Sequence, residues 1–353
     1  MAGLQTKIIV MDVGYRYTKL GVSGDSHPRC IIPTTFRDPK SGTVKSVFDY
    51  KKPEELYNNF VEFLHYLYFK KILISPKDTT VVVVDSLLST IQIRETLAKV
   101  LFCHLQIASL LMVPSHVVAL YTLGVPTALV VDIGYQEATV IPVLRGLPDL
   151  YKDADAEKAE TVKNLSDKAI EDIKVRLCFV TTLDRSRKID AGEEVRHPPC
   201  VDYNVSGSEM LRVSGKIRET ACEVLFQLDN DEISLTLMLL NALTKCPIDM
   251  RRALAGNIFL IGGTSSLPGM KSRLLNELRH YVKTPKYQNK LFIDSFKMHS
   301  APSKENYTAW LGGSIVGSTE VVNMHSITKE VYKREKDIPD WANLKYNTIS
   351  VDK

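Results

Sequence analysis

The chain has 353 residues, of which 44% are hydrophobic and 24% charged, with 45 basic and 41 acidic side chains. That length is enough for two hydrophobic cores, and the composition is that of an ordinary globular protein. A net charge of +4 carried by scattered lysines argues against nucleic acid as a partner. We expect no membrane insertion, because no apolar run reaches the roughly 18 residues of a membrane span and the first residues lack a signal-peptide pattern.

The cysteines and histidines show no metal-binding pattern. No two cysteines form a CxxC pair, and their spacings fit no zinc site. We expect reduced, mostly buried thiols, as in a cytosolic protein. The six cysteines are Cys30, Cys103, Cys178, Cys200, Cys222 and Cys246. His104 and His116 lie in apolar stretches and are interpreted as core histidines rather than ligands.

The first third of the chain alternates strands and helices. Residues 7–11, 20–23 and 29–32 predict three short strands, the first two forming a hairpin. Residues 54–71 predict a helix, because apolar residues recur there at helical spacing. The run "TTVVVVDSLL" predicts a strand buried on both faces, and residues 94–103 a second helix. A strand over 108–113 leads into a helix through Tyr121, which we expect Ser115 to cap, and this alternation indicates an α/β fold.

A faint internal repeat is the most informative feature of the sequence. "VMDVGYRYTKLGV" near the start recurs as "VVDIGYQEATVIPV" at residues 130–143. Each copy reads as a strand, an aspartate, an apolar residue, a glycine, a tyrosine and a second strand. The repeat predicts two related α/β units whose hairpins form a cleft with Asp12 on one wall and Asp132 on the other.

A third loop follows a strand later in the chain. Residues 258–261 predict a strand that ends in Gly262, Gly263 and Thr264, with a helix beginning near Pro268. The amides of such a turn can approach a sugar or phosphate closely. Three stretches are predicted to be polar surface segments: residues 37–53, residues 151–172 as a solvated helix or connector, and residues 184–204 as a loop.

Together these segments resemble the actin superfamily over nearly the whole chain. "PRCIIP" after the first hairpin, "IEDIKVRLCFV", "CPIDMRRALAGNIFLIGGTSSLPGM" and "TAWLGGSIVGS" carry the resemblance. It implies two similar RNase H-like α/β domains around a nucleotide cleft. The first would comprise residues 1–122 with 311–353, and the second residues 123–310.

The resemblance also implies a set of nucleotide-binding residues. Asp12 and Asp132 would hold Mg²⁺ through water, the alternative being aspartates that only close hairpin turns. Residues assigned to ATP or ADP are Asp12, Gly14, Lys19, Asp132, Gly134, Lys174, Gly262, Gly263 and Thr264. Val175 stands where the family has an acid for the ribose. Tyr15, Arg16 and the run from Tyr135 to Glu137 are bulkier than a phosphate loop prefers, which weakens the expectation of tight binding.

Two departures from the family pattern argue against turnover and filament growth. Ser115 and Thr139 replace the glutamine and histidine that position the attacking water, and without them phosphoryl transfer should slow by orders of magnitude. Residues 37–53 and 146–173 are shorter than the corresponding family segments. Both missing parts belong to the pointed end of an actin-like molecule. The expectation is a pseudo-ATPase with shortened pointed-end subdomains that terminates a filament.

Three functions remain open at this point. "RETLAKVLF", "VPSHVVAL" and "IPDW" resemble the divergent branch found at the pointed end of dynactin. That branch implies a cytoplasmic, cytoskeletal structural subunit that binds dynactin's filament-forming actin-related protein and other pointed-end subunits, and through them dynein. The alternatives are a functional actin-like ATPase and a nuclear actin-related subunit of a chromatin-remodelling complex.

Overall fold

A computed structural model describes residues 7–77, 79–144, 147–148, 166–206, 209–229 and 231–338. Within those ranges, no helix is both long and apolar enough to cross a bilayer. The chain divides into two compact units. Unit 1 comprises Met1–Pro126, Gly146–Pro148 and Ala301–Lys353, and unit 2 comprises Thr127–Arg145 and Asp149–Ser300.

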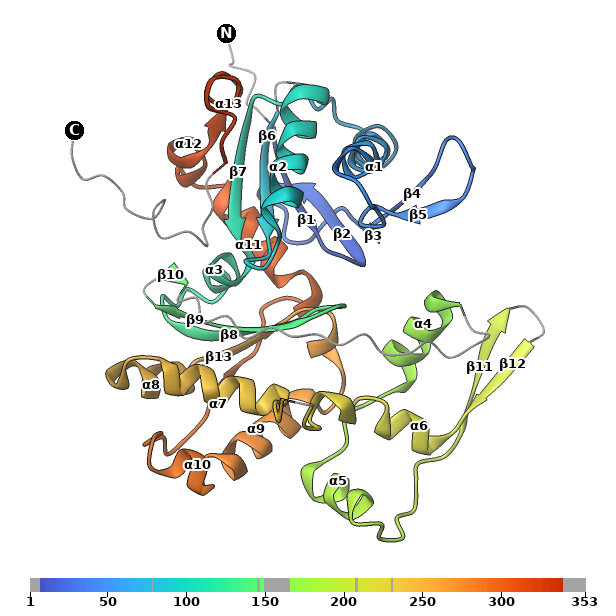
Figure 1. The fold of residues 1–353 in the computed structure, drawn as a ribbon, viewed down its shortest axis with the longest axis vertical. Helices are drawn as coiled ribbons and strands as arrows, with labels where there is room; N and C mark the ends of the chain where they lie inside the picture. Colours follow the sequence, from blue (N-terminus) through green and yellow to red (C-terminus); the bar gives the residue numbers. More distant parts are fainter. Residues whose placement is uncertain are drawn as a thin grey trace. The chain divides into compact units, whose positions relative to one another are not determined.

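Unit 1 contains both strands and helices (Figure 1). Its strands are β1 (Ile8–Val13), β2 (Tyr17–Val22), β3 (Cys30–Pro33), β4 (Thr35–Arg37), β5 (Val44–Ser46), β6 (Thr80–Asp85), β7 (Ser109–Pro114), β10 (Leu147–Pro148) and β15 (Ile327–Thr328). Its helices are α1 (Pro53–Tyr66), η1 (Leu67–Ile72), α2 (Ile91–Lys99), η2 (Val100–His104), α3 (Ser115–Tyr121), η5 (Glu305–Tyr307), α11 (Thr308–Gly317), α12 (Val321–His325) and α13 (Lys329–Glu335).

The main sheet of unit 1 has the order β15-β7-β6-β1-β2-β3. β1 pairs in parallel with β6 and antiparallel with β2. Because side chains alternate along a strand, Val81 and Val83 of β6 join the core beneath α1 and α2, whereas Val82 and Val84 pack with residues of α3 and α11. A strand covered on both faces accounts for the unbroken β-branched run, so this prediction is confirmed.

The predicted helices of unit 1 are also present. α1 buries Leu56, Phe60 and Phe63 on one side, as its apolar spacing predicts. The prediction that Ser115 caps α3 is wrong, because Pro114 is the capping residue and Ser115 begins the helix. In α11 the fully buried Trp310 donates its indole Nε1–H to the Val10 carbonyl oxygen at 3.0 Å. That bond ties the late helix to β1.

Unit 2 repeats the same plan with different helices. Its strands are β8 (Ala128–Ile133), β9 (Ala138–Leu144), β11 (Val201–Ser206), β12 (Glu209–Val213), β13 (Ile258–Ile261) and β14 (Met298–His299). Its helices are α4 (Asp167–Leu177), α5 (Leu183–Asp190), α6 (Gly215–Thr220), η3 (Glu223–Leu225), α7 (Leu235–Lys245), α8 (Ile248–Ala255), η4 (Thr264–Ser266), α9 (Met270–Tyr281) and α10 (Pro285–Gln288).

The strand pairing in unit 2 matches that of unit 1. β8 pairs antiparallel with its hairpin partner β9 and parallel with β13, as β1 does with β2 and β6. The core includes Leu129 and Val131 of β8, packed with apolar residues of α7 and α9. The shared arrangement confirms the duplicated α/β organisation that the sequence repeat predicts.

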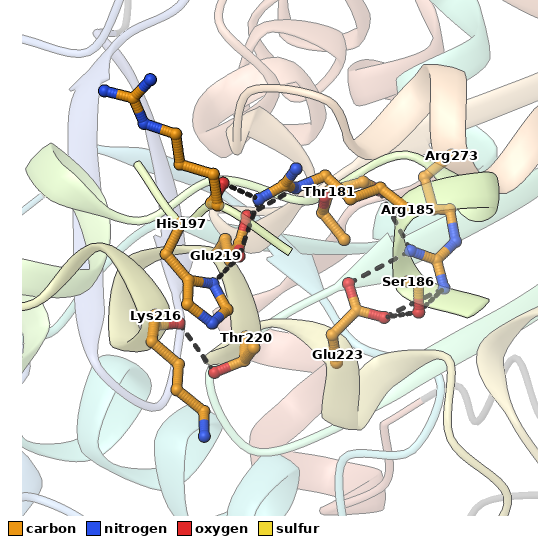
Figure 2. A network of polar contacts seen from close by, with 10 residues as sticks. Thr181, Arg185, Ser186, His197, Lys216, Glu219, Thr220, Glu223 and Arg273 are labelled. Atoms are coloured by element: carbon orange, nitrogen blue, oxygen red, sulfur yellow. Dashed lines mark hydrogen bonds and ion pairs between the residues drawn. The ribbon is translucent and has the colours of Figure 1, made fainter. Parts of the chain in front are cut away.

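A buried polar network joins three helical elements of unit 2 (Figure 2). Arg273 of α9, 3% exposed, forms ion pairs with Glu277 at 2.8 Å and with Glu223 of η3 at 3.0 Å. Its guanidinium also donates to the Thr181 carbonyl oxygen at 3.0 Å and to Ser186 Oγ of α5 at 3.1 Å. Glu277 lies one helical turn further along α9, whereas the other acceptors belong to segments distant in sequence. The network therefore fixes the packing of α5, η3 and α9 against one another.

Unit 2 contains a second group of ion pairs, centred on Glu219. Glu219 of α6 is fully buried and pairs with Arg185 of α5 at 2.9 Å and with His197. Desolvation raises the pKa of the Glu219 carboxyl, but hydrogen bonds from Arg185 and His197 outweigh it and hold the pKa below its ordinary value. The loop that carries His197 is therefore fastened to α6 by a charged contact (Figure 2).

Several predictions for surface segments need correction. Residues 184–204 are not one loop, because α5 covers residues up to Asp190 and β11 begins at Val201. The prediction of a polar surface segment over residues 37–53 agrees with the structure, where exposed β5 pairs with β4 as a hairpin. The predictions for residues 151–165 and most of the segment 146–173 fall outside the described residues. Among the cysteines, Cys178, Cys222 and Cys246 are buried, but Cys103 and Cys200 are exposed.

Candidate nucleotide site

The first hairpin places Asp12 and Lys19 side by side. They are cross-strand partners in the β1–β2 register, and Lys19 Nζ lies 2.9 Å from Asp12 Oδ2. Each side chain is 16% exposed, so the pair remains open to a ligand. Gly14 occupies the turn, where a Cβ would lie 2.7 Å from the Tyr17 carbonyl oxygen. The structure thus brings together the three residues of unit 1 that the sequence assigns to phosphate and Mg²⁺.

The tip of this hairpin is braced by residues that the sequence argument missed. Thr34 Oγ1 donates to the Gly14 carbonyl oxygen at 2.7 Å and contacts Thr18 Oγ1 at 2.9 Å. The Tyr15 ring stacks on Phe48, with centroids 5.1 Å apart and planes 9° from parallel. Tyr15 therefore packs against the segment after β5. Only the three-dimensional contact reveals this, because nothing near Tyr15 in the sequence marks Phe48 as its partner.

A second carboxylate lies near Asp12 in unit 1. Asp85 ends β6, whose Val84 is the parallel partner of Asp12, and it pairs with Arg94 Nε at 3.0 Å. Burial raises the pKa of Asp85 to about 6, Arg94 opposes that rise, and the charge of Asp12 adds to it. Ligand sites of α/β sheets lie at the carboxyl ends of parallel strands. The position of Asp85 could therefore have identified it from the sequence as a candidate site residue.

The second hairpin carries Asp132 in the equivalent place. Asp132 is the cross-strand partner of Thr139, which occupies the position that Lys19 holds in the first hairpin. The turn closes through the Gly134 amide, which donates to the Glu137 carbonyl oxygen at 3.0 Å. Thr139 is 5% exposed. A buried threonine hydroxyl is a weak base for activating water.

The Gly-Gly-Thr loop packs directly on this second hairpin. Ile261 pairs with Asp132, and Gly262 follows with φ of +91°. A Cβ at Gly262 would collide with Asp132 Oδ1 and lie 2.5 Å from the Ile133 carbonyl oxygen, so only glycine fits. A Cβ at Gly263 would meet no described atom within 4 Å. The two adjacent glycines therefore have different roles: one permits contact with the hairpin, and the other leaves open space.

Lys174 and Thr264 join the same cluster in unit 2. Thr264 Oγ1 donates to the Gly134 carbonyl oxygen at 3.1 Å, and Lys174 Nζ of α4 lies 3.3 Å from Thr264 Oγ1. The neighbouring Val175 is 62% exposed. All the predicted residues of unit 2 thus gather around one hairpin tip: Asp132, Gly134, Lys174, Gly262, Gly263 and Thr264.

These residues suit a nucleotide phosphate with Mg²⁺. Mg²⁺ prefers carboxylate oxygens and usually binds through one or two of them, with water and phosphate completing its shell. Within unit 1 such an oxygen is offered by Asp12, beside Lys19. Within unit 2 it is offered by Asp132, with Lys174 supplying positive charge in the same cluster. Among the described residues, no group of three or more His, Cys, Asp or Glu side chains could hold a metal ion.

His116 lies beside Ser115, the other residue that replaces a hydrolytic side chain. His116 is fully buried, and Ser115 Oγ lies 3.1 Å from its Nδ1. Burial lowers the pKa of His116 to about 4. The interpretation of His116 as a core histidine is confirmed, whereas that of His104 is wrong, because His104 is exposed.

The burial of His116 predicts acid sensitivity. Its folded pKa of about 4 lies below the ordinary 6.5, so the unfolded chain binds the proton first and stability falls as pH drops from 6.5 to 4. Across this pH range, protonation of His116 is expected to lower the free energy of unfolding by about 3 kcal/mol in total. Urea unfolding at pH 7 and pH 4 should show a smaller acid loss for His116→Gln than for the wild type. His27→Gln, at an exposed position, should keep the wild-type loss; equal losses in all three proteins would contradict the prediction.

Comparisons with known proteins agree with this architecture. The Actin family profile matches residues 3–232 and 152–338. Actin-related protein 10 of Dictyostelium discoideum is 26% identical over 431 aligned positions, covering 95% of this chain and 89% of that protein. Actin-like protein 7A of Rattus norvegicus and of Mus musculus is 26% identical in each case, covering 89% of this chain and 78% of the relative. With the family profile spanning both units and the duplicated hairpins in place, the chain belongs to the actin family.

Proposed function

We propose that this protein is a non-catalytic actin-related subunit that caps the pointed end of the dynactin filament and supports dynein-driven transport on microtubules. It would bind the filament-forming actin-related protein of dynactin and neighbouring pointed-end subunits in the cytoplasm. The similarity to actin-related protein 10 and the phrases shared with the pointed-end branch support this assignment.

The observation that carries the proposal is the closed turn between β4 and β5. Filament-forming relatives are expected to have a longer loop here that inserts into the next subunit. In this chain the Asp38 amide donates to the Thr43 carbonyl oxygen at 2.9 Å, and Lys45 Nζ lies 2.6 Å from Asp38 Oδ2. The hydrogen bond from Lys45 is the main cause that holds the pKa of Asp38 below its ordinary range.

Several further hydrogen bonds of this turn are made within the turn itself. Ser41 Oγ donates to Asp38 Oδ2 at 3.0 Å, and Gly42 supplies a left-handed residue with φ of +70°. A short turn that satisfies its own hydrogen bonds has little to insert into a neighbour. A subunit with such a turn can dock at the end of a filament and cannot template the next subunit there.

Bound nucleotide would have a structural role in this proposal. Asp12, Lys19 and Gly14 in unit 1, with Asp132, Lys174 and the Gly262–Thr264 loop in unit 2, are the residues that would hold ATP or ADP with Mg²⁺. Ser115 and Thr139 provide neither of the side chains that the family uses to orient water. The protein would therefore bind nucleotide without useful hydrolysis.

Affinity purification of the tagged full chain from cells tests the assignment to dynactin. Dynactin subunits should be recovered in fixed proportion, and an antibody against the tag should mark one end of the short filament in electron micrographs. Recovery with nuclear chromatin-remodelling subunits instead, or labelling along the whole filament, would contradict the proposal.

The turnover prediction is tested separately. Purified protein should retain nucleotide after gel filtration, and phosphate release under excess Mg-ATP should not exceed that of Asp132→Ala. Steady phosphate release by the wild type that the Asp132→Ala change abolishes would instead establish the ATPase alternative.

A further inference from the structure

Two helices of unit 1 end at the same place on its surface. α1 and α2 pack against each other, and each passes into a π-helical turn, η1 and η2 respectively. After these turns, Leu73 and Gln106 adopt left-handed conformations, with φ of 55° and 57°. π-Helical turns and left-handed residues other than glycine are uncommon and gather at functional sites. Two such helix endings lie side by side on this surface.

A depression of about 340 Å³ lies where the two helices end. His65 and Phe69 line it from the α1–η1 side, and His104 lines it from η2. Pro76 and Leu105 are buried and supply an apolar base, while Lys77 is exposed at the same depression. The volume is at the small end of the range for ligand pockets, which fits one anchoring side chain better than a whole cofactor.

Lys77 gives this depression its positive charge, since histidine is counted as neutral at pH 7. Its described lining residues include two histidines and one lysine and no acidic side chain. Basic residues also occupy the last turn of each π-helical segment, Lys70 and Lys71 in η1 and His104 in η2. A surface of this charge attracts a negatively charged partner and disfavours a basic one.

Aromatic and aliphatic groups extend the surface beyond the depression. Phe69 is 45% exposed, and its ring lies 4.5 Å from that of His65. Tyr66 and Leu73, the residues that flank η1, are 39% and 76% exposed. Lys71 Nζ lies 5.2 Å from the centre of the Tyr66 ring. Exposed aromatic side chains are enriched in protein interfaces, and the presence of both Tyr66 and Phe69 here favours a peptide chain over a compact small molecule.

We infer that this surface, the η1–η2 site, binds an acidic peptide segment of a partner protein, with an aliphatic or aromatic side chain of that segment seated between Phe69 and Leu105. Acidic residues on either side of the anchor would face Lys77, His104 and the lysines of η1. The inference is independent of the proposed role in dynactin, because it uses only contacts within unit 1.

Fluorescence anisotropy with a fluorescein-labelled peptide, EDELFEDE, tests the inference on the full-length protein. The peptide should bind, and its affinity should fall as salt is raised. Lys77→Glu and Phe69→Ser should each weaken binding at least about tenfold. Lys188→Glu, the same charge reversal at an exposed position of α5, should change affinity by less than about twofold.

Further peptides separate the inference from simpler explanations. EDESSEDE lacks the anchor and KRKLFKRK reverses the charge, and both should bind at least about tenfold more weakly. Because Phe69 and Lys77 are exposed, their variants should keep the wild-type unfolding midpoint. The inference is overturned if EDELFEDE does not bind, if Lys77→Glu binds it as well as the wild type, or if either control peptide binds equally. Complete displacement of EDELFEDE by equimolar phenylsuccinate would also overturn it, in favour of a small-molecule site.

Discussion

Replacing Arg273 with methionine is expected to lower the free energy of unfolding by about 3–5 kcal/mol. Arg273 is 3% exposed and is the cation shared by Glu223 and Glu277. Methionine is apolar and close to arginine in length, so the variant would leave two carboxylates in a buried place without their counter-charge. Breaking a buried ion pair from one side is among the most costly single changes in a protein core.

Urea unfolding followed by circular dichroism measures this effect. Arg279→Met provides a matched control, because Arg279 lies on the same helix and is exposed, with its Nη1 3.5 Å from Asn276 Oδ1. It should change stability by no more than about 0.5 kcal/mol. Similar midpoints for the two variants would show that the network of Arg273 adds little to the stability of unit 2.

Gly262→Ala is expected to destabilise the protein by about 3 kcal/mol and to impair nucleotide retention. The position has φ of +91°, which an alanine adopts only with strain, and the added Cβ would collide with the carboxylate of Asp132. Relief would require moving Asp132 or the end of β13. The substitution should therefore disturb the predicted Mg²⁺ ligand as well as the fold.

Gly263→Ala is the matched control for that change. The same methyl group enters open space there, and the backbone of Gly263 has φ of −66°, which alanine adopts freely. It should leave the unfolding midpoint unchanged or raise it slightly, since alanine restricts the unfolded chain. Thermal unfolding and the nucleotide released by acid from each purified protein measure both effects. Equal losses at the two glycines would show that loop flexibility, rather than contact with Asp132, decides the result.

Much of the fold follows from local patterns in the sequence. The β-branched run of β6, the apolar spacing of α1 and the repeated hairpin each depend on residues a few positions apart, and the structure has the predicted element in each case. The pairing of Asp12 with Lys19 belongs to the same class, because a hairpin register places these residues opposite each other. Gly262 and Asp132 come together because the adjacent parallel strands β13 and β8 end at the same edge of the sheet.

Other features depend on contacts that no local pattern encodes. Arg273 and Glu277 lie on the same side of α9 as Met270 and Leu274, and this charged pair within an apolar stripe was the one available sign of the buried network. The partner Glu223 could not be identified from sequence, because it lies 50 positions away. Likewise, an apolar neighbourhood in sequence did not distinguish buried His116 from exposed His104.

The sequence by itself determined the alternation of strands and helices in the first third of the chain, the duplicated hairpins and the resemblance to the actin family. Periodic burial and turn chemistry act over a few residues and can therefore be read along the chain. Tertiary structure decided which charges are buried, that Tyr15 stacks on Phe48, and that two helix endings form a basic, aromatic surface. Those outcomes depend on which segments, distant in sequence, exclude water from each other, and that is settled only when each unit folds and packs its own core.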